Sequence, residues 1–195
     1  MNPHVPATRR LRSTVVAALA LVGAVWIGVF AYQSLPSLSA VLRLLDNIDQ
    51  HGPPGATVFD EENPSLGNLD PDLLDALRQA ATAAADDGVE LVVTSGRRSA
   101  EYQEQLLREA VAKYGSEREA ARWVASPQTS AHVTGEAVDI GPTEAATWLS
   151  AHGAEYGLCQ IYRNEPWHFE LRPGADEYGC PALYADASHD PRMPQ

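Results

Sequence analysis

The chain is short of basic residues. Its 195 residues include 14 lysines and arginines against 26 aspartates and glutamates, a net charge of −12 at pH 7. Arg9, Arg10 and Arg12 all precede the first acidic residue, so the rest of the chain is more acidic than this total suggests. Proteins that bind nucleic acid need a basic surface for the phosphates. The composition therefore argues against a nucleic-acid partner.

The chain also lacks cysteines beyond Cys159 and Cys180, and it lacks internal repeats. An even number of thiols favours a disulfide in a domain that faces an oxidising compartment. Zinc ligation by thiolates is the alternative for the same pair. Hydrophobic residues make up 45% of the sequence, which suffices for a core in a chain of this length, so we expect one folded domain.

Charged residues are missing from one long segment near the N-terminus. Thr14 to Tyr32 has none, and at about 1.5 Å per residue it is long enough to cross a hydrocarbon core of about 30 Å. Because arginines precede this segment, we expect the preceding residues to stay in the cytoplasm. The sequence thus predicts a cytoplasmic N-terminus (1–13), a transmembrane signal anchor (14–34), a linker (35–60) and an extracytoplasmic domain (61–195).

A cleaved signal peptide is the alternative for the apolar segment. Ser37 and Ser39 form a pair of small residues that resembles a cleavage site before Ala40. The apolar run is longer than the usual core of a signal peptide, which favours the uncleaved anchor. The anchor predicts a single-pass protein of the cell membrane, whereas cleavage predicts a secreted one.

The remainder of the chain alternates between helical and extended patterns. Asp70 and Pro71 form an N-cap followed by proline at the first helical position, and Ser99 is a second N-cap. The predicted helices cover residues 71–87, 100–114, 116–124 and 143–152, and the predicted strands cover 90–96, 136–140, 157–163 and 168–172. We expect an α+β domain in which helices flank a small antiparallel sheet. The apolar side chains expected in its core include Leu106, Leu107, Val111 and Trp123.

Candidate metal ligands lie in two motifs, SAHVTGEAVDI at 130–140 and EPWHF at 165–169. His132, Asp139 and His168 offer two imidazoles and one carboxylate, a set that leaves Zn²⁺ an open position for a water molecule. A lone histidine is more often a hydrogen-bonded core residue. However, Asp139 lies in an apolar strand, where burying an unpaired carboxylate is costly and a metal would remove that cost. We therefore expect a catalytic zinc site.

The spacing of these ligands differs from the helical HExxH motif, in which both histidines lie on one helix face. Here Gly135 supplies a bend after His132, and Asp139 follows on a strand. Pro166 places Glu165 on a turn before His168 begins the next strand. Glu165 is thus the candidate general base, because it lies near a ligand and can reach the attacking water. An exposed loop glutamate is the alternative.

These residues resemble a known family. The pattern SxHxxGxAxD at 130–139, followed by ExxH at 165–168, is similar to the zinc site of VanY-type D-alanyl-D-alanine carboxypeptidases. That family belongs to the LAS group, named for lysostaphin, D-Ala-D-Ala metallopeptidases and sonic hedgehog. Upstream, SGRRSAEYQ at 95–103 resembles the family's SGYRSxxxQ segment. The three blocks occur in the family's order and cover the last two thirds of the chain.

The resemblance implies roles for individual residues. It implies that Glu165 is the catalytic base and that Arg98 helps to hold substrate, as a guanidinium can bind a carboxylate or an oxyanion. Arg97 stands at the family's usual tyrosine position and is the alternative to Arg98. Ser130 and Gln103 match further positions that contact substrate, although each also has a structural explanation.

The resemblance also implies an activity. We expect a zinc-dependent D-alanyl-D-alanine carboxypeptidase that acts on peptidoglycan stem peptides ending in D-alanine, with the membrane as its attachment site. L,D-carboxypeptidase, dipeptidase and endopeptidase activities remain open within the same class. A wall-binding module without catalysis on the same fold is the alternative from another class, and the presence of Glu165 argues against it.

Overall fold

The computed structural model describes residues 56–60 and 62–192. The predicted membrane anchor at 14–34 and the cytoplasmic residues before it lie outside this part of the chain. Among the described residues, no helix combines the length and apolar character needed to cross a bilayer.

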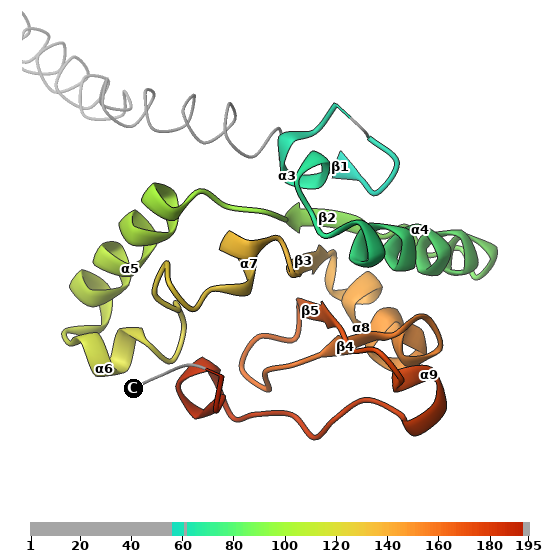
Figure 1. Cartoon of the computed structure of the whole chain (residues 1–195). Coiled ribbons are helices and arrows are strands. Elements are labelled where there is room, and N and C mark those ends of the chain that lie inside the picture. The colour runs from blue at the N-terminus through green and yellow to red at the C-terminus, as the bar shows by residue number, and fades with distance from the viewer. Residues whose placement is uncertain (1–55, 61, 193–195) are drawn as a thin grey trace, which may run out of the picture. The chain divides into compact units, whose positions relative to one another are not determined.

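The described strands form one antiparallel sheet in the order β1-β2-β3-β5-β4 (Figure 1). The strands are β1 (Ala56–Thr57), β2 (Val92–Ser95), β3 (Ala137–Gly141), β4 (Leu158–Gln160) and β5 (His168–Leu171). The expected α+β class with a small antiparallel sheet is confirmed. Strand β1 pairs with Val92 and Val93, so the sheet includes two residues that the sequence analysis assigned to the linker.

Three helices begin and end close to their predicted positions, which were 71–87, 100–114 and 143–152. The described helices are α3 (Pro64–Gly67), α4 (Pro71–Asp86), α5 (Ala100–Tyr114), α6 (Glu117–Ala120), α7 (Ala131–Thr134), α8 (Thr143–His152) and α9 (Ala175–Tyr178), with 3₁₀ turns η1 (Gly153–Tyr156) and η2 (Ala187–His189). The Asp70 carboxylate accepts hydrogen bonds from the backbone N–H groups of Asp72 and Leu73. The Ser99 hydroxyl accepts a hydrogen bond from the backbone N–H of Tyr102. Both predicted caps are therefore confirmed.

Two expectations about α5 and its neighbour are wrong. The helix expected over 116–124 is the single turn α6, and a turn follows it. The apolar side chains on these helices are not core residues: Leu106, Leu107 and Val111 are half-buried, and Trp123 is 39% exposed. The reason is that α5 packs on α6 rather than against the core face of the sheet. Trp123 instead stacks on Tyr114 with 5.8 Å between ring centroids.

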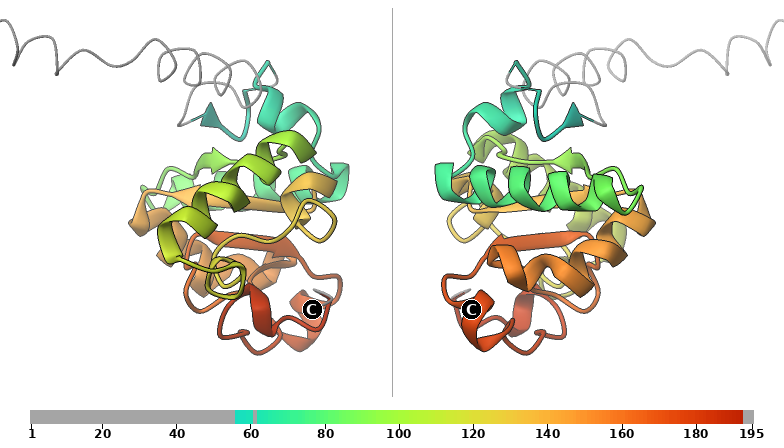
Figure 2. Two further views of the ribbon diagram at one scale, coloured as in Figure 1. Left: turned by 90° about the vertical axis from the view of Figure 1, so that its left-hand side faces the viewer. Right: turned by 90° about the vertical axis from the view of Figure 1, so that its right-hand side faces the viewer.

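Helices α4 and α8 cover one face of the sheet, and α5 and α7 lie on the opposite side (Figure 2). The core lies under α4 and α8, where Leu73, Leu77 and Leu149 are fully buried. Side chains alternate between the two faces of a strand. In β3 and β5 this alternation sends Val138 and Phe169 into the core. We call the covered side the core face and the opposite side the site face.

The two cysteines form a disulfide. The Cys159 and Cys180 sulfurs are 2.01 Å apart, and the bond ties β4 to the segment after α9. This confirms the predicted pairing and rules out the alternative in which the thiolates bind zinc.

Candidate metal centre and active site

The site face brings the three predicted metal ligands together from three elements. His132 lies on α7, Asp139 on β3 and His168 at the start of β5, and Asp139 is paired with His168 across the two strands. Nε2 of His132 is 3.2 Å from Nδ1 of His168. Oδ1 of Asp139 is 3.4 Å from each of these nitrogens. All three side chains are buried.

This triangle fits Zn²⁺. With bonds of about 2.0–2.1 Å, two ligands of a tetrahedral zinc ion lie about 3.3 Å apart. The three observed separations, 3.2 and twice 3.4 Å, match that edge length. Oδ1 of Asp139 is buried and has no hydrogen bond to the described residues. A metal ion would satisfy this oxygen, which would otherwise be costly to bury.

His132 is oriented by two close backbone approaches. Its Nδ1 lies 2.9 Å from the carbonyl oxygen of Gly96, so Nδ1–H donates there and the lone pair of Nε2 faces the other ligands. Gly96 passes so near to α3 that a Cβ would lie 2.3 Å from the carbonyl oxygen of Ser65. Gly135 ends α7 with φ of +82°, and a Cβ there would lie 2.6 Å from the carbonyl oxygen of Asn68. Both glycines are thus required by the backbone that holds His132.

His168 is oriented by Glu170, two residues further along the same face of β5. Nε2 of His168 donates to Oε1 of Glu170 over 3.1 Å, which leaves the Nδ1 lone pair facing His132 and Asp139. Glu170 is only 1% exposed. Its carboxylate also binds Arg172 at 2.5 Å and Arg192 at 2.7 Å. These two guanidinium groups compensate the buried negative charge.

The pKa values of the ligands follow from these contacts. Burial lowers the pKa of His132 below its usual value. Burial would also lower the pKa of His168, but the nearby carboxylates of Asp139 and Glu170 raise it to about 9. Burial would raise the pKa of Asp139, yet the nearby His132, His168 and Arg98 hold it well below its usual range. A metal would therefore replace a proton on His168 when it binds.

Arg98, not Arg97, points into the site. Nη2 of Arg98 binds Oδ2 of Asp139 at 2.7 Å, and Nε donates to the Ser95 hydroxyl at 2.8 Å. Its Nη1 donates to Oε1 of Gln103 at 3.3 Å. Arg97 is exposed. A guanidinium has five N–H groups, so two remain without a partner among the described residues and can meet a ligand.

Gln103 and Ser130 are both buried beside this arginine. The amide of Gln103 accepts from Arg98 and donates to the carbonyl oxygen of Ala125 at 2.9 Å. Gln103 therefore positions Arg98. Ser130 precedes α7 without a hydrogen bond from its side chain to the helix end, and it lines the same small pocket as Arg98. Contact of either residue with a substrate stays a prediction.

Glu165 lies on the predicted turn and lines the pocket together with His132 and His168. The backbone N–H of His168 donates to the carbonyl oxygen of Glu165 at 3.1 Å, which closes the turn. Burial raises the pKa of Glu165 to about 7. A carboxyl group with this pKa can both accept and release a proton near neutral pH.

Sequence reasoning missed most of the support for His168. Glu170 lies outside the two metal-ligand motifs, and period-two alternation along β5, which puts it on the same face as His168, is the signal that could have assigned it. Arg192 had no signal, because it lies 22 residues from Glu170 in an irregular tail. Tyr162, whose ring centroid is 5.0 Å from that of His168, was also missed. Its hydroxyl donates to Asp190 at 3.1 Å.

Comparison with known proteins agrees with this geometry. The family model VanY, described as D-alanyl-D-alanine carboxypeptidase, matches residues 67–173, more than half of the chain. The chain belongs to the VanY family. The expected resemblance to the LAS zinc peptidases is therefore confirmed, and the matched range includes all three ligands and Glu165.

Relatives of known structure extend the comparison. The chain is 29% identical to VanYB in complex with D-alanine-D-alanine, with a TM-score of 0.52 and coverage of 57% of this chain and 78% of that one. A Zn(II) complex of the vancomycin resistance D,D-pentapeptidase VanY, an E175A mutant, gives 31% identity and a TM-score of 0.50, covering 53% and 72%. This relative binds the metal that the His132, Asp139 and His168 cluster fits, which supports Zn²⁺ as the cofactor.

A D-alanyl-D-alanine carboxypeptidase of Enterococcus faecalis (strain ATCC 700802 / V583) is 32% identical over 139 residues. The match covers 57% of this chain and 52% of the relative. The chain thus spans about half the length of that curated relative.

Proposed function

We propose that this protein is a zinc-dependent D-alanyl-D-alanine carboxypeptidase that trims peptidoglycan stem peptides. The observation that supports this most directly is the triangle of His132, Asp139 and His168 with tetrahedral edge lengths, beside a glutamate whose pKa burial raises to about 7. A metal held only for structure would have four protein ligands, whereas this cluster offers three.

The catalytic chemistry is divided between the metal and Glu165. Zn²⁺ held by the three ligands would act as a Lewis acid on the scissile carbonyl and make water a better nucleophile. Glu165 takes a proton from the attacking water and later passes it to the leaving amine. A pKa near 7 suits both steps, because a group that is too acidic accepts the proton poorly and one that is too basic releases it poorly.

Arg98 supplies the positive charge that a carboxypeptidase needs for the C-terminal carboxylate of its substrate. Its guanidinium lines the pocket that contains Glu165 and His168. Asp139, Ser95 and Gln103 fix the orientation of this group, so little side-chain freedom is lost when substrate binds. A relative captured with D-alanine-D-alanine supports a stem peptide that ends in D-alanine as the substrate.

We also propose that the domain works outside the cytoplasm, attached to the cell membrane by residues 14–34. The Cys159–Cys180 disulfide supports this location, because such bonds persist in oxidising compartments. Secretion after cleavage before Ala40 is the alternative. Mass measurement of the mature N-terminus distinguishes the two.

Product analysis with a defined stem pentapeptide tests the activity. We expect release of the terminal D-alanine, loss of this release with a chelator, and recovery with added Zn²⁺. Hydrolysis of free D-Ala-D-Ala without hydrolysis of the pentapeptide would assign dipeptidase activity instead. Cleavage only of a tetrapeptide stem would assign L,D-carboxypeptidase activity. Binding to cell wall without release from any stem peptide would refute the enzymatic proposal.

A further inference from the structure

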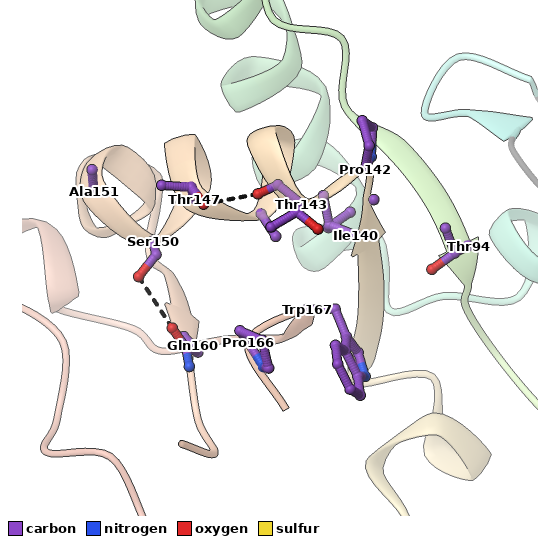
Figure 3. Close-up of a pocket in the computed structure, with 12 residues that line it drawn as sticks. Thr94, Ile140, Pro142, Thr143, Thr147, Ser150, Ala151, Gln160, Pro166 and Trp167 are labelled. Carbon is purple, nitrogen blue, oxygen red and sulfur yellow. Dashed lines mark hydrogen bonds between the residues drawn. The ribbon is translucent and has the colours of Figure 1, made fainter. Parts of the chain in front are cut away.

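A second hollow, larger than the catalytic pocket, lies beside α8. It has a volume of about 630 Å³ and lies between α8, the end of β3 and the Pro166–Trp167 turn. Figure 3 shows Thr147 and Ser150 of α8 on one side, and Pro166 and Trp167 on the other. We call this hollow the α8 groove. It has no role in the zinc chemistry described above.

The α8 groove is lined without a single charged side chain. This is unusual in a chain with 26 acidic residues and a net charge of −12. Its polar groups are hydroxyls and one amide, which belong to Thr94, Thr143, Thr147, Ser150 and Gln160. The lining therefore favours a neutral ligand that carries hydrogen-bonding groups of its own.

Trp167 adds an aromatic face to this lining. Its side chain is 42% exposed although it belongs to the turn beside the metal site. The indole N–H donates to no group within the described part of the chain, so it is available to a ligand. An aromatic face next to hydroxyl and amide groups suits a sugar ring, which presents apolar C–H groups on one face and polar groups at its edge.

The hydroxyl groups of the groove are held in place by the protein. The Thr147 hydroxyl donates to the carbonyl oxygen of Thr143 at 2.8 Å. The Ser150 hydroxyl donates to Oε1 of Gln160 at 3.1 Å, as drawn in Figure 3. The amide nitrogen of Gln160 in turn donates to the carbonyl oxygen of Tyr162 at 2.8 Å. The oxygens of both hydroxyls keep lone pairs that can accept hydrogen bonds from a ligand.

One short turn separates the α8 groove from the catalytic pocket. Glu165 and His168 line the catalytic pocket, whereas the two residues between them, Pro166 and Trp167, line the groove. The backbone of Trp167 is fixed to β3 by a hydrogen bond of 2.9 Å from the N–H of Ile140. The Pro166–Trp167 turn therefore borders the α8 groove, and the residues on either side of it, Glu165 and His168, border the catalytic pocket.

We infer that the α8 groove binds the neutral, N-acylated sugar chain of the polymer whose peptide enters the zinc pocket. This inference rests on the proposed function for the choice of polymer, and on the uncharged lining and Trp167 for the choice of a sugar. Trp167 stacks on a sugar ring, while Thr147, Ser150 and Gln160 meet its hydroxyl and amide groups. The groove would then favour stems that are still attached to glycan over free peptides.

Binding of a sugar oligomer tests the inference without any need for catalysis. The probe is a β-1,4-linked tetramer of N-acetylglucosamine, titrated into the full-length protein and followed by calorimetry and tryptophan fluorescence. We expect Trp167→Ala to weaken binding at least tenfold. Thr147→Arg, which places a long charged side chain in the groove, should do the same without touching the turn beside the metal ligand.

Tyr178→Ala is the matched control, because Tyr178 is 81% exposed and does not line the groove. Its binding should equal that of the unaltered protein. Absence of binding would overturn the inference, as would binding that Trp167→Ala and Thr147→Arg both leave unchanged. Displacement of the sugar by a neutral peptide such as pentaglycine with higher affinity would also overturn it, because the groove would then be a peptide site.

Kinetics separate this inference from the proposed function. A stem pentapeptide linked to its disaccharide should have a kcat/KM about tenfold higher than that of the free pentapeptide. Thr147→Arg should remove this advantage and leave the free pentapeptide unaffected. If neither stem is hydrolysed, the proposed function fails, and the sugar titration still decides the inference. Equal kcat/KM values for both stems in the unaltered enzyme would contradict cooperation between the groove and the active site.

Discussion

The two faces of the sheet differ in what holds them together. On the core face, α4 contributes small and aliphatic side chains such as Leu73, Leu77 and Ala80, all of them fully buried. On the site face, four buried side chains are ionisable, and each has a partner of the opposite charge or a hydrogen bond: His132, Asp139, His168 and Glu170. Burial of apolar surface is itself stabilising, whereas burial of charge is tolerated only with compensation.

This contrast predicts that substitutions on the two faces affect different properties of the protein. A substitution on the core face should change the free energy of unfolding and leave the chemistry of folded molecules intact. A substitution on the site face should change chemistry or metal affinity far more than stability. Each prediction below tests one side of this separation, and a result in which both properties change together would break it.

The largest effect is expected from Glu165→Gln. Removal of the proton acceptor should lower kcat by about 100- to 10,000-fold, a typical contribution of a general base. Zn²⁺ affinity and thermal unfolding should stay close to those of the unaltered protein, because Glu165 is not among the three ligands. Turnover measurements with metal titration check this.

Glu136→Gln is the control for that substitution. Glu136 lies in the same motif as Asp139 but is exposed and bonded to the Thr134 hydroxyl at 2.8 Å. Its turnover should match that of the unaltered enzyme. Full activity in Glu165→Gln would show that the base has been assigned to the wrong residue.

The same contrast explains what the sequence could predict. Core-face helices follow from local signals: Asp70, Pro71 and the apolar spacing of α4 lie within a few residues of one another, and the predicted helix is confirmed. The metal ligands could be predicted because they lie within two recognisable sequence motifs, at 130–140 and 165–169. The ion pair between Arg192 and Glu170, the residue that orients His168, could not be predicted from the sequence. These two residues are 22 positions apart, and no local pattern joins them.

The failure on α5 has a related cause. Spacing shows that Leu106, Leu107 and Val111 share a helix face, but it does not say what that face meets. In the structure α5 packs mainly on the short helix α6, and the three side chains stay half-buried. Periodicity thus predicts amphipathic character, whereas the depth of burial depends on tertiary contacts.

Leu77→Ala tests the core face. Leu77 is fully buried between α4 and the sheet, so its truncation should cost about 2–5 kcal/mol of unfolding free energy. The kcat of the molecules that remain folded should not change. Chemical denaturation monitored by circular dichroism gives the first value. Leu74→Ala, at a half-buried position on the same helix, should cost distinctly less, and an equal cost would contradict the burial argument.

Glu170→Gln tests the support of the metal site. The amide keeps the shape of the side chain but gives His168 a weaker acceptor, so Zn²⁺ affinity should fall about 10- to 100-fold. Activity should recover at saturating Zn²⁺, because Glu165 and the ligands are intact. Glu177→Gln, an exposed position on α9, is the control and should leave Zn²⁺ affinity unchanged. Unaltered affinity in Glu170→Gln would mean that the hydrogen bond to His168 does not tune the metal.

The smallest effect concerns acid stability at the C-terminal end of the domain. Burial would raise the pKa of Asp186, but hydrogen bonds from Ser188, His189 and Arg122 lower it to about 2. Because the folded-state pKa lies below the unfolded value, this carboxylate stabilises the fold above about pH 4. That contribution is lost as the pH falls towards 2.

Asp186→Asn should therefore cost about 1 kcal/mol at neutral pH, and the difference from the unaltered protein should vanish between about pH 4 and pH 2. Urea unfolding at a series of pH values measures both. Asp176→Asn, which removes a carboxylate at an exposed position on α9, is the matched control. Zn²⁺ affinity should not respond, because Asp186 bonds to Arg122, Ser188 and His189 rather than to the metal ligands. A parallel loss of Zn²⁺ affinity would show that the tail and the metal site are coupled, and the separation of the two faces would then fail.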